Sequence, residues 1–369
     1  MKIRLFRIAG IAVALLISPA WASALVDKPM LVVQITADQL RGDLLERYRS
    51  VLTDGFARIE NGGYWIRRGE VDHGLTLSFP GHATLATGMY PSHHGLTANE
   101  WWENQKGTWG EVDVSADDRF SMLDAPVRHG PSPHNMTATT LGEWVKASDP
   151  RSKSVALGTG NPIPVAYGGK QSDAVYWFDE SSGKFTSSTY YSQTMTAWVS
   201  AFNASQLPKY EKQTWTLGVP PFAIGLANPD ATPYENHGRF NTFPHFYALE
   251  SVPQHGGSTI TPYPRWFART PLKDEAGIIV RFKENMVFDA ATGIHGSPYA
   301  AERLIPIIFY GMNIKPGSRD SGGRTVDVAP TLAAAAQIAS PAGLDGVVLS
   351  NIVRSNSRRE EIPMMREPQ

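Results

Sequence analysis

The sequence contains no cysteine among its 369 residues. This absence excludes disulfide bonds, thiolate metal sites and lipid attachment at cysteine. An excess of charge of one sign is also lacking, because 34 basic and 35 acidic residues give a formal net charge of −1. Such a balance gives no electrostatic footprint for nucleic acid or for an anionic membrane. A metal ion in this protein would have to be held by histidine, aspartate, glutamate or a hydroxyl group.

A long hydrophobic run occurs only at the N-terminus. Three basic residues within the first seven positions precede the apolar residues 8–24, which end in alanines at alternate positions. This pattern predicts a cleavable secretory signal over residues 1–24, since the run is short and wrongly flanked for a membrane span. We therefore expect a periplasmic or secreted protein with no stable membrane span after removal of the signal.

The apolar patterns along the rest of the chain predict an α/β fold. Short runs rich in β-branched residues predict strands buried in a mainly parallel sheet, and patterns with a period of three to four residues predict helices. The predicted strands are Met30–Thr36, Lys153–Gly158 and Ile305–Gly311, the predicted hairpin is Ala174–Tyr191 around Ser182-Gly183, and the predicted helices span Leu40–Ile59 and Thr325–Ile338. Asp38 follows the first strand, at the sheet edge where α/β proteins bind ligands.

Two regions lack these patterns. Residues 208–271 are rich in proline, aromatic and small polar residues, which favours surface loops or a cap over the sheet. Residues 355–369 are polar and charged, and we expect a loose C-terminal tail there.

Ser78 is the first candidate for chemistry. It lies in LSFPGHATLATGMYPSHHG (residues 77–95), where a proline two residues later suits the first turn of a helix. The serine has two interpretations. It could cap the helix with its hydroxyl, or it could be a nucleophile activated by a metal, with the helix amides facing an anionic substrate.

The order of the motifs resembles the alkaline phosphatase superfamily, in its branch of type I phosphodiesterases, nucleotide pyrophosphatases and related bacterial phosphatases. The resemblance implies that Ser78 is the nucleophile, that Asp38 is a zinc ligand and that Asn99, in LTANEWW, binds a phosphoryl oxygen. GIHGSPYAAERLIPIIFYG (residues 293–311) is similar to the late histidine motif, which makes His295 a further zinc ligand. The matches cover most of residues 28–345.

The resemblance further implies a three-layer fold, with helices on both faces of a mainly parallel central sheet and a loop-rich cap. It implies two Zn²⁺ ions, one held in part by Asp38 and Ser78 and the other in part by His295, and a small phosphate ester as substrate. Carboxylate and imidazole groups suit zinc, and paired metals can activate a hydroxyl and hold a phosphoryl oxygen.

The sequence also departs from the family pattern. Between residues 100 and 290 it has neither an aspartate four residues before a histidine nor an Asp-His-Gly unit. The Asp-His-Gly at residues 72–74 comes too early, and we interpret it as a turn at a strand end. We interpret the missing ligands as an internal shortening of the domain 25–354, with a junction near residues 264–276. Gly158-Thr159-Gly160 stands where monoesterase relatives have Lys-x-Arg, which favours diester substrates.

Two functions remain open from the sequence. One is an exported, zinc-dependent hydrolase of phosphoric esters that forms a phospho-enzyme at Ser78. The other is a degenerate, inactive relative that retains at most weak metal or anion binding, because the ligands present are few. A serine hydrolase triad of Ser78, His82 and an acid is disfavoured, since no G-x-S-x-G motif surrounds Ser78. We expect His82 to be structural or to orient a ligand.

Overall fold

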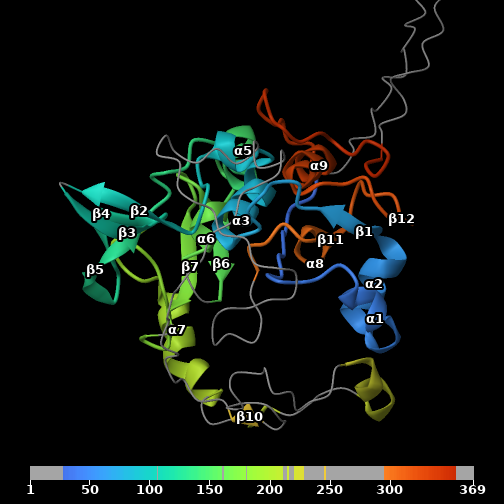
Figure 1. Cartoon of the computed structure of the whole chain (residues 1–369), viewed down its shortest axis with the longest axis horizontal. Coiled ribbons are helices and arrows are strands. Elements are labelled where there is room, and N and C mark those ends of the chain that lie inside the picture. Colours follow the sequence, from blue (N-terminus) through green and yellow to red (C-terminus); the bar gives the residue numbers. More distant parts are fainter. Residues whose placement is uncertain are drawn as a thin grey trace, which may run out of the picture.

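A computed structural model describes most of the chain (Figure 1). The described residues are 28–105, 107–159, 162–179, 181–210, 214–215, 220–227, 245–246 and 295–354. The predicted signal, junction and tail lie outside these residues, as does most of the predicted loop region. Helices and strands are mixed along the chain, which confirms the predicted α/β class.

The first sheet contains β1 (Tyr64–Glu70), β11 (Leu304–Phe309) and β12 (Gly317–Arg319), with β1 in the middle. Strand β1 pairs antiparallel with β11, where Ile66 is in register with Ile307, and parallel with β12. Ile66 is completely buried in a core built with β11 and with the last part of the described chain. The strand predicted around residues 305–311 is therefore present.

The second sheet contains β6 (Val155–Gly158), β7 (Ala174–Asp179) and β8 (Lys184–Thr186). Strand β7 is central, parallel to β6 and antiparallel to β8. The predicted hairpin is confirmed, and its turn uses Gly183 at a φ of 65°, a conformation that favours glycine.

Helix α3 (Ser78–Thr87) lies between the two sheets (Figure 1) and packs against α6 (Pro164–Gly168) and α9 (Val328–Ala335). Ala83 of α3 and Ala166 of α6 are both completely buried in one cluster. Small side chains at this contact let the two helix backbones approach closely. Gly88 ends α3 in the left-handed conformation. Helix α3 is thus fixed on more than one side, and its first residue is Ser78.

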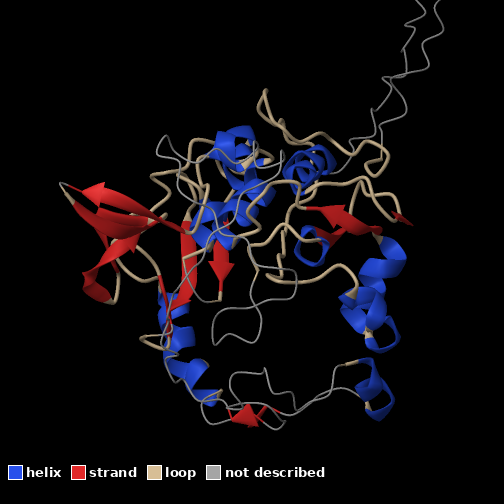
Figure 2. Ribbon diagram, in the orientation of Figure 1, coloured by secondary structure: helices blue, strands red, loops and turns tan. Residues whose placement is uncertain are grey.

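The remaining elements surround this centre. The helical ones are α1 (Leu44–Arg47), η1 (Arg49–Val51), α2 (Asp54–Gly62), α4 (Pro91–His94), α5 (Leu141–Ser148), α7 (Ala197–Ser205), η2 (Leu207–Lys209), η3 (Pro221–Leu226), α8 (Ala300–Arg303) and η6 (Thr325–Asp327). The antiparallel pairs are β2 (Glu100–Gln105) with β3 (Thr108–Asp113), β4 (Ala116–Met122) with β5 (Ala125–Pro131), and β9 (Thr214–Trp215) with β10 (His245–Phe246). Figure 2 shows β2 to β5 projecting together on one side of the helices.

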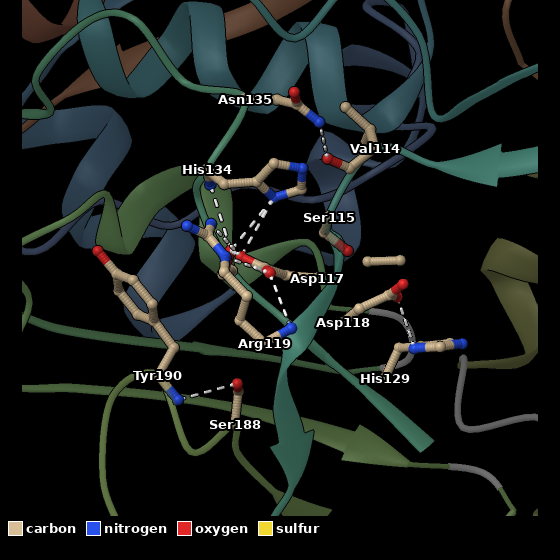
Figure 3. A network of polar contacts seen from close by, with 12 residues as sticks. Val114, Ser115, Asp117, Asp118, Arg119, His129, His134, Asn135, Ser188 and Tyr190 are labelled. Atoms are coloured by element: carbon tan, nitrogen blue, oxygen red, sulfur yellow. Dashed lines mark hydrogen bonds and ion pairs between the residues drawn. The ribbon is translucent and has the colours of Figure 1, made fainter. Parts of the chain in front are cut away.

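A polar network anchors the base of the projecting hairpins (Figure 3). The buried carboxylate of Asp117 accepts hydrogen bonds from Arg119 Nε at 2.8 Å, Arg119 Nη2 at 2.7 Å and Ser132 Oγ at 2.5 Å. The contacts with Arg119 and Ser132 hold the pKa of Asp117 well below its usual range. Beyond Ser132, Asn135 donates to the carbonyl of Val114, and the backbone N–H of Val114 donates to the carbonyl of Asn99 at 2.8 Å.

The predicted buried strand at residues 30–36 is wrong. Within the described part of the chain this segment pairs with no strand, and Leu31, Val33 and Ile35 are 76%, 60% and 88% exposed. Strand β6 is present as predicted, but Val155 and Leu157 are each 60% exposed. A cavity of about 1230 Å³ borders both segments. A strand is buried on both faces only where other strands flank it and helices cover the sheet. The described strands pair with one another and not with residues 30–36.

The sheet also differs from the predicted one. Among the described strand pairs, only β1–β12 and β6–β7 are parallel. Instead of one mainly parallel sheet, the described chain has two separate three-stranded sheets, each with one parallel and one antiparallel pair. The helix predicted over Leu40–Ile59 is divided into α1, η1 and α2, because Leu52 and Thr53 are extended. Its predicted stop at Gly62-Gly63 is confirmed.

Two further predictions concern local features. The Asp-His-Gly unit at residues 72–74 begins two residues after the end of β1, in agreement with its interpretation as a strand-end turn. Within the described residues, no helix combines the length and the apolar character needed to cross a bilayer.

Candidate active site

Three predicted site residues meet at the N-terminus of α3. Ser78 Oγ donates a hydrogen bond to Asp38 Oδ2 at 2.8 Å and lies 3.1 Å from His295 Nε2. His295 Nε2 in turn lies 3.4 Å from Asp38 Oδ1. Asp38 and His295 are 40 and 217 positions from Ser78 along the chain, so the fold itself brings them together.

Ser78 does not cap the helix. Leu77 occupies the N-cap position and Ser78 is the first helical residue, so the Ser78 hydroxyl is not the cap of this helix. The capping interpretation of Ser78 is therefore wrong. Its hydroxyl instead contacts a carboxylate and an imidazole at the positive end of the helix dipole.

Asn99 lies beside the same helix end. Its Oδ1 accepts a hydrogen bond from the backbone N–H of Phe79 at 2.9 Å, which satisfies an amide of the first turn of α3. The side chain thus supports the helix that carries Ser78. Its role with a phosphoryl oxygen stays a prediction.

The orientation of the His295 ring follows from a backbone contact. His295 Nδ1 lies 2.6 Å from the carbonyl oxygen of Thr76, which can only accept, so Nδ1 carries a hydrogen and donates it. In the neutral ring the lone pair is then on Nε2, the atom that faces Ser78 and Asp38. This is the tautomer that can bind a metal through Nε2 or accept a proton there.

The charges of Asp38 and His295 stabilise each other. Burial by itself raises the pKa of the Asp38 carboxyl, but the hydrogen bond and charge of His295, with a smaller effect of His82, hold that pKa well below its usual range. The hydrogen bond that the Asp38 carboxylate accepts from the protonated ring raises the pKa of the His295 imidazole, against the opposing effect of burial. Asp38 is therefore an anion at neutral pH.

His82 lies one helical turn after Ser78. Its Nε2 is 3.8 Å from Asp38 Oδ1, its ring packs on Tyr167 with 5.6 Å between centroids, and burial lowers its pKa. In the described part of the chain its buried Nδ1 has no hydrogen-bond partner, and no hydrogen bond joins it to Ser78. A triad that pairs Ser78 with His82 is thus not formed.

Some residues of the site were not found from the sequence. Thr36 Oγ1 and Tyr167 Oη are 2.6 Å apart and tie the segment before Asp38 to α6, and burial raises the pKa of Tyr167. The two residues are 131 positions apart, so no local pattern connects them. Thr76, which orients His295, is likewise an ordinary threonine in the sequence.

The spacing of the donor atoms can be compared with that of zinc ligands. Ligands of a tetrahedral zinc ion at 2.0–2.2 Å are separated by roughly 3.3 Å. The separations of 3.1 Å between Ser78 Oγ and His295 Nε2 and of 3.4 Å between His295 Nε2 and Asp38 Oδ1 are close to this value. These two separations fit one ion shared by the three side chains, whereas Ser78 Oγ and Asp38 Oδ2, at 2.8 Å, lie closer together than two such ligands. Among the described residues, however, no group of three or more His, Cys, Asp or Glu side chains is arranged to hold a metal.

Several known proteins resemble this chain in sequence. The family described as type I phosphodiesterase / nucleotide pyrophosphatase matches residues 32–242. The chain is 31% identical over 238 residues to alkaline phosphatase PhoV of Synechococcus elongatus, covering 63% of this chain and 43% of that protein. It is 32% identical over 187 residues to alkaline phosphatase PafA of Elizabethkingia meningoseptica, covering 50% of this chain and 34% of that protein. The chain therefore spans less than half the length of these curated relatives.

Solved structures show the same fold. The crystal structure of wild-type alkaline phosphatase PafA has a TM-score of 0.75 at 18% identity, and the match covers 89% of this chain and 99% of that chain. This likeness confirms the predicted fold type.

Proposed function

Because this chain belongs to the family of type I phosphodiesterases and nucleotide pyrophosphatases, we propose that it is an exported, metal-dependent hydrolase of phosphoric esters that acts through Ser78. The observation that carries the proposal is the convergence of Ser78, Asp38 and His295 from three distant parts of the chain. Ser78 Oγ attacks phosphorus, the ester alcohol leaves, and water later cleaves the resulting phosphoserine ester.

The side chains around Ser78 have distinct tasks in this proposal. The Ser78 hydroxyl hydrogen points at Asp38, and His295 Nε2 lies 3.1 Å from the same hydroxyl oxygen, where the neutral ring offers a second acceptor. These contacts orient the oxygen and can take up its proton. The positive end of α3 favours a phosphoryl group in front of Ser78.

A cation is needed at this position for an electrostatic reason. The Asp38 carboxylate lies 2.8 Å from the nucleophile and would repel an incoming phosphate. Asp38, His295 and Ser78 would hold one zinc ion, which supplies charge neutralisation and lowers the pKa of a bound hydroxyl. The described residues offer no ligand set for the second ion that the resemblance implies.

We propose small phosphate esters as the substrates, with diesters preferred over monoesters. Gly158 and Thr159 at the end of β6 provide no cation where monoesterase relatives carry two. A monoester dianion would therefore lack charge-assisted hydrogen bonds that a diester monoanion needs less.

One observation favours a second candidate function. Among the residues that the structure describes, the donor set contains two of the usual zinc-binding side chains, Asp38 and His295, and a tight site generally has more. A non-catalytic relative with weak zinc or phosphate binding would have this donor set. Weak binding of zinc or inorganic phosphate in a calorimetric titration, together with no turnover of any ester, would support this alternative.

The test is hydrolysis of a chromogenic phosphodiester by the full chain in the presence of zinc. We expect turnover that a chelator removes, that Ser78→Ala abolishes and that Ser78→Thr, which keeps a hydroxyl, partly retains. Turnover by Ser78→Ala at the wild-type rate, or no turnover above buffer by the folded wild type, would contradict the proposal.

A further inference from the structure

The carboxylate of Glu302 gathers the hydrogen-bond donors of the loop that carries His295. Glu302 Oε2 accepts from the backbone N–H groups of Gly296 at 2.7 Å and Ser297 at 2.5 Å. Its Oε1 accepts from Ser297 Oγ. Two consecutive amides and a hydroxyl thus converge on one negative charge, and such charge-assisted hydrogen bonds are the stronger kind.

Thr76 connects this loop to the segment that leads to Ser78. Thr76 Oγ1 lies 2.8 Å from the carbonyl oxygen of Ser297 and 3.0 Å from Glu302 Oε2, so its single hydrogen is shared between them. The same oxygen accepts from the N–H of Gly296 at 3.1 Å. Thr76 also provides the carbonyl that accepts from His295 Nδ1. The loop and the segment are therefore joined by side-chain and backbone contacts, two residues before Ser78.

We infer that Glu302 is a positioning residue, which holds the His295 loop against Thr76 and thereby fixes the ring with its Nε2 toward Ser78. In the described part of the chain Glu302 makes no hydrogen bond or ion pair with Ser78 or Asp38, so it acts through His295. The kinetic part of its test rests on the proposed function, whereas the spectroscopic part does not.

The physical reason is the number of donors that depend on this carboxylate. Without it the amide and the hydroxyl of Ser297 lose their acceptor, and the amide of Gly296 keeps only its longer hydrogen bond to Thr76 Oγ1. Unpaired polar groups in a partly buried loop are costly. Gly296 has a φ of 129°, a conformation that few residues tolerate, and the loop needs its anchor to stay there. Once the loop relaxes, the short contact between His295 Nδ1 and Thr76 is lost. The ring is then free to exchange tautomers.

The first experiment reads the His295 tautomer without metal, substrate or turnover. Long-range ¹H–¹⁵N correlation spectra of ¹⁵N-histidine-labelled protein at alkaline pH distinguish the two neutral tautomers, and His295→Ala assigns the signal. We expect the Nδ1–H form in the wild type and a mixture of both forms in Glu302→Ala. Glu302→Gln, which keeps one acceptor oxygen, should lie between them. Glu46→Gln removes a carboxylate that bonds to Arg67, and it should leave the His295 signal unchanged.

The second experiment is kinetic. With a phosphodiester and zinc, we expect Glu302→Ala to lower kcat about 10- to 100-fold, as loss of a residue that orients a metal ligand commonly does, with little change in KM. A wild-type tautomer in folded Glu302→Ala would overturn the inference, whatever the kinetics. If Glu302→Ala does not fold, a wild-type tautomer in Glu302→Gln together with unchanged kcat would overturn it. An inactive wild type with the expected change of tautomer would contradict the proposed function and support the role of Glu302.

Discussion

The buried His94 ring should make the stability of the protein depend on pH, because its hydrogen bonds keep the ring neutral. The ring is completely buried, and its Nδ1 accepts from the backbone N–H of Leu96 at 3.1 Å. Its Nε2 lies 3.1 Å from Thr84 Oγ1, whose hydrogen goes to the carbonyl of Pro80 at 2.8 Å. Thr84 must therefore accept from Nε2, so the ring is neutral and has no place for a second proton. This contact holds α3 to the turn at Gly95.

The size of this effect on the free energy of unfolding follows from the difference between the pKa of His94 in the folded and in the unfolded chain. Burial lowers the pKa of His94 from 6.5 to about 3, with a smaller effect of the neighbouring His73. Because the unfolded chain binds this proton more readily, the contribution of His94 to stability is present above pH 6.5 and is lost as the pH falls. Between pH 8 and pH 5 the free energy of unfolding should drop by about 2 kcal/mol from His94 alone. His73, whose pKa burial lowers to about 4, should add a loss of similar size.

Urea denaturation at pH 8 and at pH 5 tests this reasoning. His94→Asn keeps an acceptor for Leu96 but cannot take up a proton. The variant loses the buried ring and its contact with Thr84, so it should be less stable than the wild type at pH 8. Its drop in unfolding free energy between the two pH values should be about 2 kcal/mol smaller than that of the wild type. An equal drop in His94→Asn and in the wild type would refute the reasoning.

Three further predictions concern the fold and the site. Ile35→Ser should change the free energy of unfolding by less than about 0.5 kcal/mol because Ile35 is 88% exposed, whereas Ile66→Ala in the core should cost about 2–5 kcal/mol in the same urea titration. A large loss at Ile35 would mean that residues 30–36 are buried after all. Gly296→Ala should lower both Tm and turnover, since its φ is 129° and a Cβ there would lie 2.8 Å from a leucine side chain; an unchanged Tm would contradict this geometry. Asn99→Asp keeps the oxygen that caps α3 and should retain Tm while turnover falls, whereas Asn99→Ala should lose about 1 kcal/mol of stability as well; full turnover in Asn99→Asp would exclude a phosphoryl contact of the amide.

The elements that the sequence predicted correctly are those with local causes. The hairpin after Ala174 has a glycine at its turn, and the helix that begins in η6 and continues as α9 has a continuous apolar pattern. The prediction for residues 30–36 was wrong because the burial of a strand depends on the strands that flank it. Its apolar residues are typical of a strand, but among the described residues no other strand pairs with it on either edge.

The candidate site divides in the same way. Motifs in fixed order indicated Ser78, Asp38 and His295, and the structure brings their side chains within hydrogen-bonding reach. The residues that orient them could not be read from the sequence. Thr76 and Glu302 are 226 positions apart, and Glu302 in YAAER looks like any acidic residue in a short helix. Only the fold reveals that its carboxylate supports the loop of His295.

The covalent intermediate at Ser78 tests the central claim most directly. The protein would be mixed with a phosphodiester and zinc, quenched in acid during turnover, digested and analysed by mass spectrometry. The account predicts a phosphoryl ester on the peptide that contains Ser78, and none on the same peptide of Ser78→Ala. Steady turnover with a modification on another residue, or turnover that persists in Ser78→Ala, would contradict it.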